Sequence, residues 1–137
     1  MQFQHRAGSG DRSGTNAIDE LLDAIQRYFN LMHDCDIANF ADVFSPAAQL
    51  HGYRDGKMVC WPAAEYKEVL KARQSPLSLG SPRQDSVLLI DIASASHAFA
   101  KVEVRIHAGI YHDYLTYHKI DGRWVITSKG YHLMRTV

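Results

Sequence analysis

The chain has 137 residues, of which 46% are apolar. This length suits one domain with a substantial core and is too short for two ordinary domains. Fifteen basic residues balance fifteen acidic ones and neither sign forms a long run, so the sequence lacks the basic surface that binds nucleic acid or an anionic membrane. No apolar stretch approaches the roughly 18 residues of a membrane-spanning helix. We therefore expect one globular domain that binds neither of these partners.

The cysteines and the N-terminal segment both indicate a cytoplasmic protein. Cys35 and Cys60 have neither the spacing of metal ligands nor the density of a disulfide framework, so we expect free thiols in a reducing compartment. Residues 1–16, "MQFQHRAGSGDRSGTN", are rich in Gly and Ser and lack the apolar core of a secretory signal. They predict a flexible lead-in before a single domain over residues 17–137.

Three helices are predicted in the first half of the chain. Apolar residues at steps of three and four after Asn16, the expected N-cap, predict an amphipathic helix of about five turns. Asp36 can cap a short second helix that ends at Ser45 and Pro46. Pro62 suits the first turn of a third helix in "WPAAEYKEVLKAR". The stripe along that helix consists of Tyr66, Val69, Leu70 and Arg73.

The remaining segments predict β-strands. "LHGYRDGKMVCW" is typical of a hairpin, because Asp55 and Gly56 tolerate the positive φ angles of a two-residue turn. Four alternating segments follow the third helix, over residues 86–93, 97–107, 109–120 and 123–133. Short turns separate them, which predicts an antiparallel meander. Helices followed by a meander indicate an α+β fold.

The last two strands can be paired across a turn at Asp121 and Gly122, which places Tyr117 opposite Ile126. Directly opposed residues share a face of the sheet. The inner, apolar face then carries Tyr111, Asp113, Leu115, Tyr117, Trp124, Ile126, Ser128 and His132. The outer face carries His112, Tyr114, Thr116, His118, Thr127, Lys129 and Tyr131. A β-bulge in either strand would break this assignment.

Asp113 is the unusual member of the predicted inner face. A turn at Ala108 and Gly109 places Val104 opposite it, and Ser128 and His132 lie on the diagonals. Desolvation disfavours a carboxylate in such surroundings, so we predict a raised pKa or a partner in His132. Two interpretations of Asp113 stay open, a satisfied structural group and a catalytic one. The outer face likewise suits either a dimer interface or a solvated surface.

Two stretches carry a family resemblance. "LHGYRDGKMVCWPAAEYKEVLKAR" and "DYLTYHKIDGRWVITSKGYH" resemble the signature segments of the nuclear transport factor 2-like superfamily, in its SnoaL-like and Putative lumazine-binding branch. The resemblance covers residues 17–134. It implies a cystatin-like α+β cone, in which a curved antiparallel sheet of about six strands wraps three helices and encloses a pocket. It also implies a homodimer formed through the outer face of the sheet.

Part of the chain also resembles ketosteroid isomerase. "AIQRYFNLMHDCDIANFADVF" is similar to the first helices of that enzyme, which implies that Tyr28 donates a hydrogen bond to a substrate oxyanion. "DYLTYHKIDG" resembles the strand that carries a protonated Asp as the second donor, which implies that role for Asp113. The segment "AQLHGYRDG" has no carboxylate where the enzyme carries its base. His51 could replace that base, or could pack or lie at the surface.

Two classes of function therefore stay open. The first is a homodimeric binding domain for a small, mostly apolar, planar ligand. Its expected pocket residues are Tyr53, Trp61, Val104, Leu115, Tyr117, Trp124 and Ser128. The second is a cofactor-independent isomerase, dehydratase or cyclase of the ketosteroid isomerase, SnoaL or scytalone dehydratase type. There Tyr28 and Asp113 would form the oxyanion hole and His51 or His132 would move the proton. We expect no cofactor and no metal, since no matching motif occurs.

Overall fold

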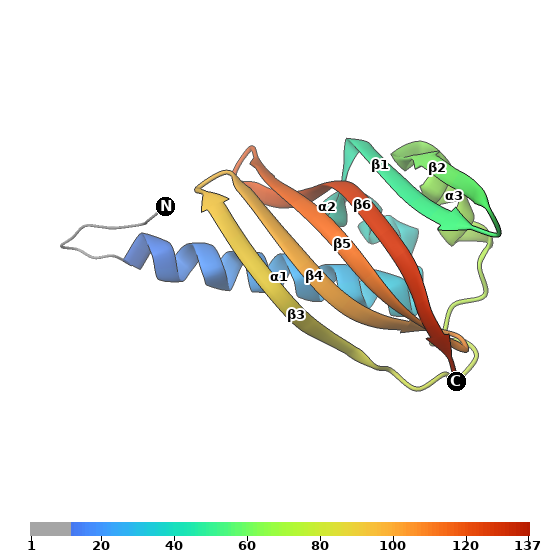
Figure 1. Ribbon diagram of the computed structural model, residues 1–137. Helices are drawn as coiled ribbons and strands as arrows, with labels where there is room; N and C mark the ends of the chain where they lie inside the picture. The colour runs from blue at the N-terminus through green and yellow to red at the C-terminus, as the bar shows by residue number, and fades with distance from the viewer. Residues whose placement is uncertain (1–11) are drawn as a thin grey trace.

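The structure, a computed structural model, describes residues 12–137, with side chains from Asn16 onward. The helical elements are α1 (Arg12–Asp34), the 3-10 turn η1 (Ile37–Asn39), α2 (Phe40–Val43) and α3 (Ala63–Ala72). The strands are β1 (Phe44–Arg54), β2 (Lys57–Pro62), β3 (Asp85–Ser94), β4 (His97–Ile106), β5 (Gly109–Ile120) and β6 (Arg123–Thr136). Figure 1 shows the sheet curving along α1, with α2 and α3 at the end near β1 and β2.

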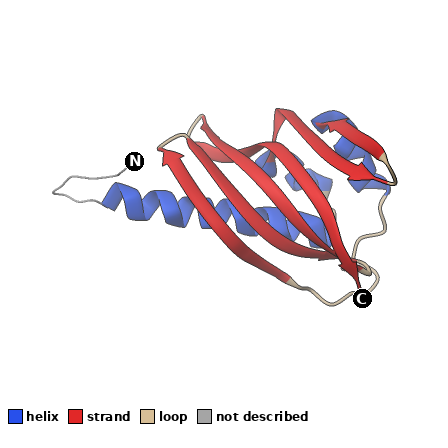
Figure 2. Cartoon of the chain, viewed as in Figure 1, coloured by secondary structure: helices blue, strands red, loops and turns tan. Residues whose placement is uncertain are grey.

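The six strands form one sheet in the order β2-β1-β6-β5-β4-β3. In Figure 2 the strands form one layer, and the helices lie behind it in this view. The predicted α+β cone is confirmed. The expectation of an all-antiparallel sheet was wrong at one pairing, because β1 lies parallel to β6. A parallel neighbour requires a long crossover, and the chain from β2 to β5 provides it. The strands of the predicted meander are all present, and β5 begins and ends where we expected.

The first helices differ from prediction at their ends. α1 begins at Arg12 rather than at Asn16, since adding residues to a formed helix costs little compared with nucleating it. Residues 1–11 of the predicted flexible lead-in lie outside the described residues. The Asp36 side chain accepts a hydrogen bond from the Ala38 N–H, as a cap should, but it opens only the 3-10 turn. The strand after α2 already begins at Phe44.

Both predicted two-residue turns are present. Asp55 and Gly56 have φ angles of 51° and 77°, and Asp121 and Gly122 have 51° and 80°. These positive φ values explain the Asp-Gly pairs, because glycine adopts them without a steric penalty and Asp tolerates them better than most residues. The register of the β1–β2 hairpin is the predicted one.

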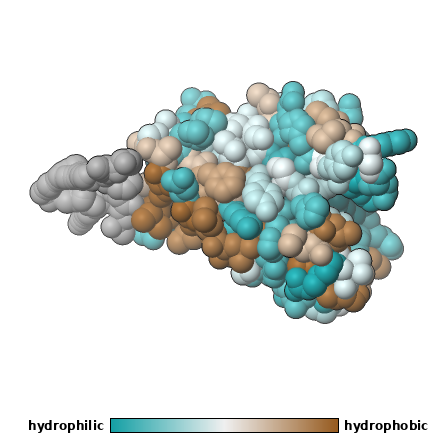
Figure 3. Space-filling model, in the orientation of Figure 1, coloured by the Kyte–Doolittle hydropathy of each residue, from teal (hydrophilic) through white to brown (hydrophobic). Residues whose placement is uncertain are grey.

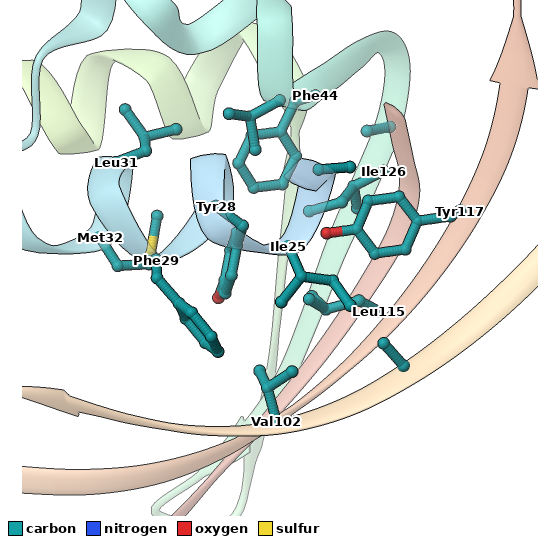
Figure 4. Packing of buried hydrophobic residues seen from close by; sticks show 14 of the residues in the cluster. Ile25, Tyr28, Phe29, Leu31, Met32, Phe44, Val102, Leu115, Tyr117 and Ile126 are labelled. Atoms are coloured by element: carbon teal, nitrogen blue, oxygen red, sulfur yellow. The ribbon is translucent and has the colours of Figure 1, made fainter. Parts of the chain in front are cut away.

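The core lies between α1 and the inner face of the sheet. In Figure 4, Ile25 of α1 lies next to Leu115 of β5, with Val102 of β4 below them. The predicted inner face of β4 is confirmed, because the side chains of alternate residues from Ala98 to Val104 are buried. The turn after β4 lies one residue earlier than expected, so Val102, not Val104, opposes Asp113. The shift in pairing is two residues, which leaves the faces unchanged.

A bulge in β6 overturns part of the inner-face assignment. Tyr117 pairs with Ile126 as predicted, but Thr116 pairs with Ser128, so Thr127 is an extra residue in β6. Its hydroxyl group lies 2.6 Å from the His118 Nδ1 atom on the outer face. A shift of one residue sends each later side chain of the strand to the opposite face. The predicted positions of Ser128, Lys129, Tyr131 and His132 were therefore wrong.

Candidate functional site

The centre of the candidate site is a hydrogen bond between Tyr28 of α1 and Asp113 of β5. The Tyr28 hydroxyl donates to the Asp113 Oδ2 atom, and both side chains are buried, with Asp113 only 2% exposed. Tyr28 reaches the strand because it lies on the core stripe of α1. Asp113 points inward because it occupies the same face of β5 as Leu115 and Tyr117, two and four residues further on, whose side chains fill the core.

Lys129 supplies a positive charge beside this pair. The shifted register turns it inward, and it is 5% exposed. Its Nζ atom lies 3.9 Å from Asp113 Oδ2 and donates a hydrogen bond of 3.3 Å to the Tyr66 hydroxyl. The ring centroids of Tyr66, Tyr28 and Tyr131 lie 5.0, 5.1 and 5.9 Å from Nζ. An ammonium group enclosed by aromatic faces gains cation–π stabilisation, which offsets part of its desolvation.

Burial sets the protonation of the pair. It raises the pKa of the Asp113 carboxyl, while the Lys129 charge and the hydrogen bond from Tyr28 act in the opposite direction. Burial, followed by the Asp113 charge, raises the pKa of Tyr28 well above its usual value. Tyr28 therefore keeps its proton at neutral pH and acts as a donor. The predicted raised pKa of Asp113 agrees with this, but its partners are Tyr28 and Lys129 rather than His132.

A cavity of about 70 Å³ opens beside Asp113 and Lys129. Four aromatic side chains line it, namely Trp61, Tyr66, Tyr111 and Tyr131. The charged residues in its lining are Arg54, Arg73, Asp113 and Lys129, and Met32 and Ile106 complete it. Tyr28 lies behind Asp113 and is not part of the lining. The cavity thus combines apolar ring faces with a concentration of charge.

Tyr131 is one of the aromatic residues that line this small cavity. Pockets for drug-sized molecules measure about 300–1,000 Å³, so the present cavity has room for one functional group rather than a whole ligand. The Tyr131 ring stacks on Trp61 with centroids 6.4 Å apart and lies so close to Gly52 that a Cβ atom there would collide with it. Its hydroxyl oxygen is buried without a hydrogen-bond partner among the described residues. No polar contact there opposes rotation of the ring.

The structure brings some predicted site residues together and separates others. Asp113 and Trp61 line the cavity, and Tyr28 contacts Asp113. Neither predicted histidine reaches it, since His132 is exposed and His51, paired with Cys60, is only half-buried and is not in the lining. Four expected ligand residues, Val104, Leu115, Tyr117 and Trp124, are buried in the core outside the cavity lining. Tyr53 is 64% exposed, and Ser128 pairs with Thr116 on the outer face.

Five residues of the cavity lining had no predicted role in the site, namely Arg54, Tyr66, Arg73, Lys129 and Tyr131. Tyr66 and Arg73 carried a usable signal, because they belong to the predicted stripe of the third helix. Lys129 and Tyr131 were assigned to the outer face, and only the bulge at Thr127 brings them inside.

Other kinds of site have little support in the described part of the chain. Residues 12–137 contain no group of three or more His, Cys, Asp or Glu side chains placed to hold a metal ion. Both cysteines are free, Cys35 half-buried and Cys60 exposed. Among these residues no helix is long and apolar enough to cross a membrane.

Comparison with solved structures defines the class of protein. An NTF2-like protein from Shewanella baltica is 22% identical, with a TM-score of 0.78 over 89% of this chain and 97% of that chain. An NTF2-like protein from Silicibacter pomeroyi is 18% identical, with a TM-score of 0.76 over 88% and 98%. A ketosteroid isomerase-like protein from Erwinia carotovora atroseptica is 14% identical, with a TM-score of 0.66 over 85% and 95%. The fold is thus that of the nuclear transport factor 2-like superfamily.

The family follows from the sequence itself. The model of the family described as "Putative lumazine-binding" matches residues 16–132. The chain belongs to this family. No curated protein matches the chain.

Proposed function

We propose that the domain binds a small planar ligand at the cavity beside Asp113 and Lys129. The observation that carries the proposal is a buried carboxyl and a buried ammonium group at one cavity whose other walls include four aromatic rings. Ring faces bind flat molecules by stacking, and a few convergent polar groups orient them. The family description names lumazine, which is a flat, oxygen-bearing ring system.

Entry of a ring requires Tyr131 to move, because the cavity of about 70 Å³ is too small for one. Rotation of Tyr131 away from Trp61 would expose the Trp61 and Tyr66 faces, whose rings are 5.8 Å apart. A carbonyl or hydroxyl oxygen of the ligand would then meet Lys129 and the Asp113 carboxyl. Tyr28 acts through Asp113 and is a positioning residue.

Thermal shift and calorimetric titration with lumazine and phenol test this proposal on the full chain. We expect the wild type to be stabilised and Lys129→Met and Asp113→Asn to bind about tenfold or more weakly, as expected for loss of a charged hydrogen-bond partner. Tyr117→Phe is the matched control, since it removes a buried hydroxyl outside the cavity lining. Equal binding by wild type and both site variants would refute the proposed anchors.

The second candidate is a proton-transfer enzyme, an isomerase, dehydratase or cyclase acting on an enolisable ketone. The juxtaposition of Asp113, whose pKa is raised, with the Lys129 amine favours it. The Asp113 carboxylate would take the α-proton and return it to another carbon, and the Lys129 ammonium group would donate to the carbonyl oxygen as it becomes an enolate, since neither His51 nor His132 lines the cavity. Incubation with 2-tetralone in D₂O tests this. If the wild type exchanges deuterium into 2-tetralone no faster than Lys129→Met does, catalysis is rejected. The proposal that the cavity binds a ligand would still stand.

We also propose a homodimer through the outer face of the sheet, in a cytoplasmic protein. The outer face carries aromatic pairs that are unusual for plain surface, with Phe99 and Tyr114 centroids 6.4 Å apart and His97 stacked on His118 at 4.6 Å. Figure 3 shows hydrophobic atoms gathered over β3 and the adjoining part of α1. Leu22 is among the exposed hydrophobic side chains. The two free thiols support a reducing compartment.

A further inference from the structure

We infer that the ligand of this cavity carries a carboxylate, and that Arg73, assisted by Arg54 and the Tyr131 hydroxyl, holds it. This inference rests on the proposed ligand-binding function and names the chemical class of the ligand.

The charge of the cavity lining favours an anionic ligand. Three cationic side chains, Arg54, Arg73 and Lys129, face one carboxyl group, Asp113. Asp113 already contacts Lys129 and accepts from Tyr28. Among the described residues, no carboxylate lies within ion-pair distance of Arg54 or Arg73. The cavity therefore holds an excess of positive charge that an anionic ligand would balance.

Two hydrogen-bond donors at the cavity lack an acceptor among the described residues. The Arg73 Nη1 atom and the Tyr131 hydroxyl are buried, and neither has a hydrogen-bond partner in the part of the chain that the structure describes. Buried polar groups are almost always paired, so two such groups at one cavity require an explanation. Both residues line the same cavity. A carboxylate offers about four lone-pair sites and accepts two hydrogen bonds from one guanidinium group, which matches this deficit.

The position of Arg73 also suits the binding of an anion. Arg73 directly follows α3, where its N–H donates to the Leu70 carbonyl oxygen at 3.2 Å, so its backbone is anchored. The Arg73 guanidinium group also lies beside the Cys35 thiol. Burial raises the pKa of Cys35, so the thiol stays neutral and leaves the guanidinium charge uncompensated. An anchored arginine with uncompensated charge is preorganised for an anion.

The size of the cavity agrees with a carboxylate. A volume of about 70 Å³ is several times the ~10–15 Å³ that a cavity needs to hold one water molecule. A carboxylate group fits this space, while the rest of the ligand would extend past Tyr131 between the aromatic walls. Burial raises the pKa of the Tyr131 hydroxyl, and the Arg54 charge opposes this effect, so Arg54 lies near the same end of the cavity.

Calorimetric titration with benzoate, benzamide and acetate tests the inference. Benzoate and benzamide share shape and differ in charge, so the comparison on wild-type protein does not depend on any variant. We expect benzoate to bind about tenfold or more tightly than benzamide, the factor typical of charge-assisted hydrogen bonds. We expect Arg73→Gln to abolish the preference and Arg54→Gln to reduce it. Arg83→Gln, at a surface arginine paired with Asp85, is the control that should retain it.

Failure of the inference can be told apart from failure of the proposed function. Equal affinity for benzoate and benzamide would overturn the carboxylate site and leave the planar ligand. A preference for benzoate that survives in folded Arg73→Gln and Arg54→Gln would also overturn it. Acetate binding as tight as benzoate and dependent on Arg73 would support the carboxylate site and count against a planar ligand. Absence of binding by all three probes would overturn both proposals.

Discussion

The Lys129 Nζ atom lies 3.9 Å from the same Asp113 carboxyl oxygen that accepts the Tyr28 hydroxyl hydrogen. The three side chains come from β6, β5 and α1, and all are buried. Each buried charge depends on the other groups, because an isolated charge in the interior is costly. A substitution of any one of these three residues should therefore affect the other two, and several measurements can test this.

Removing the Tyr28 hydroxyl should destabilise the protein, whereas removing that of Tyr117 should not. Tyr28→Phe leaves the buried Asp113 carboxyl without its donor, and we expect the free energy of unfolding to fall by about 1–3 kcal/mol. The Tyr117 hydroxyl is buried without a partner among the described residues, so Tyr117→Phe should be neutral or stabilising. Urea denaturation measures both. Equal losses in the two variants would contradict the assigned hydrogen bond.

The Lys129 charge should hold down the pKa of Asp113. Because that charge favours the ionised carboxylate, Lys129→Met should raise the pKa of Asp113 above its wild-type value. Carbon-13 NMR titration of the side-chain carboxyl measures the shift. Lys119→Met, which removes a lysine paired with Glu20, should leave the Asp113 value unchanged. A lower pKa in Lys129→Met would show that the two groups do not interact as described.

Stability should respond to pH through Asp113. Its pKa is raised in the folded protein above the unfolded value of about 3.9, so the unfolded chain releases the proton first. The unfolded state then binds fewer protons, and the stability of the wild type falls as pH rises between the two pKa values. The slope from one group cannot exceed about 1.4 kcal/mol per pH unit.

Asp113→Asn has no titratable carboxyl group at this position and serves as the reference. Chemical denaturation of both proteins from pH 3 upward gives the difference in stability. We expect wild type to lose stability relative to Asp113→Asn over this interval and then level off. A relative gain by wild type would mean that the folded-state pKa is lowered, contrary to the effect of burial.

The close approach of Gly52 and Tyr131 can be tested by Gly52→Ala. The added Cβ atom would collide with the Tyr131 ring, which must then turn away. We expect a loss of about 1–3 kcal/mol, typical of overpacking. The same substitution in a Tyr131→Ala background should cost much less, since the clash is gone. A double-mutant cycle without coupling would place Tyr131 elsewhere.

The proposed dimer predicts a change in oligomeric state. Tyr114 lies on the outer face and is 38% exposed, so Tyr114→Glu would bury a charge in the interface and should yield a monomer. Ala64→Glu, on the exposed side of α3, is the matched control and should remain dimeric. Light scattering coupled to gel filtration measures the mass. A dimer that persists in Tyr114→Glu would contradict an interface on this face.

Local patterns predicted most of the fold. A few neighbouring residues are enough to predict the Asp-Gly turns at 55–56 and 121–122. The same holds for the burial of every second residue in β5, which places Leu115 and Tyr117 on one face. The family resemblance added Tyr28 and Asp113 as a pair, and the structure places them in contact. Their roles in binding or catalysis stay a prediction.

The sequence by itself determined the α+β class, the two Asp-Gly turns and the inward direction of Asp113, because these follow from backbone preferences and alternating burial. Only the tertiary structure decided which groups surround Asp113. The bulge at Thr127 turned Lys129 inward and His132 outward, since one unpaired residue reverses the side chains that follow it, here from Ser128 to Leu133. Folding of α3 against the sheet brought Arg73 to the same cavity, over a sequence distance that no local pattern spans.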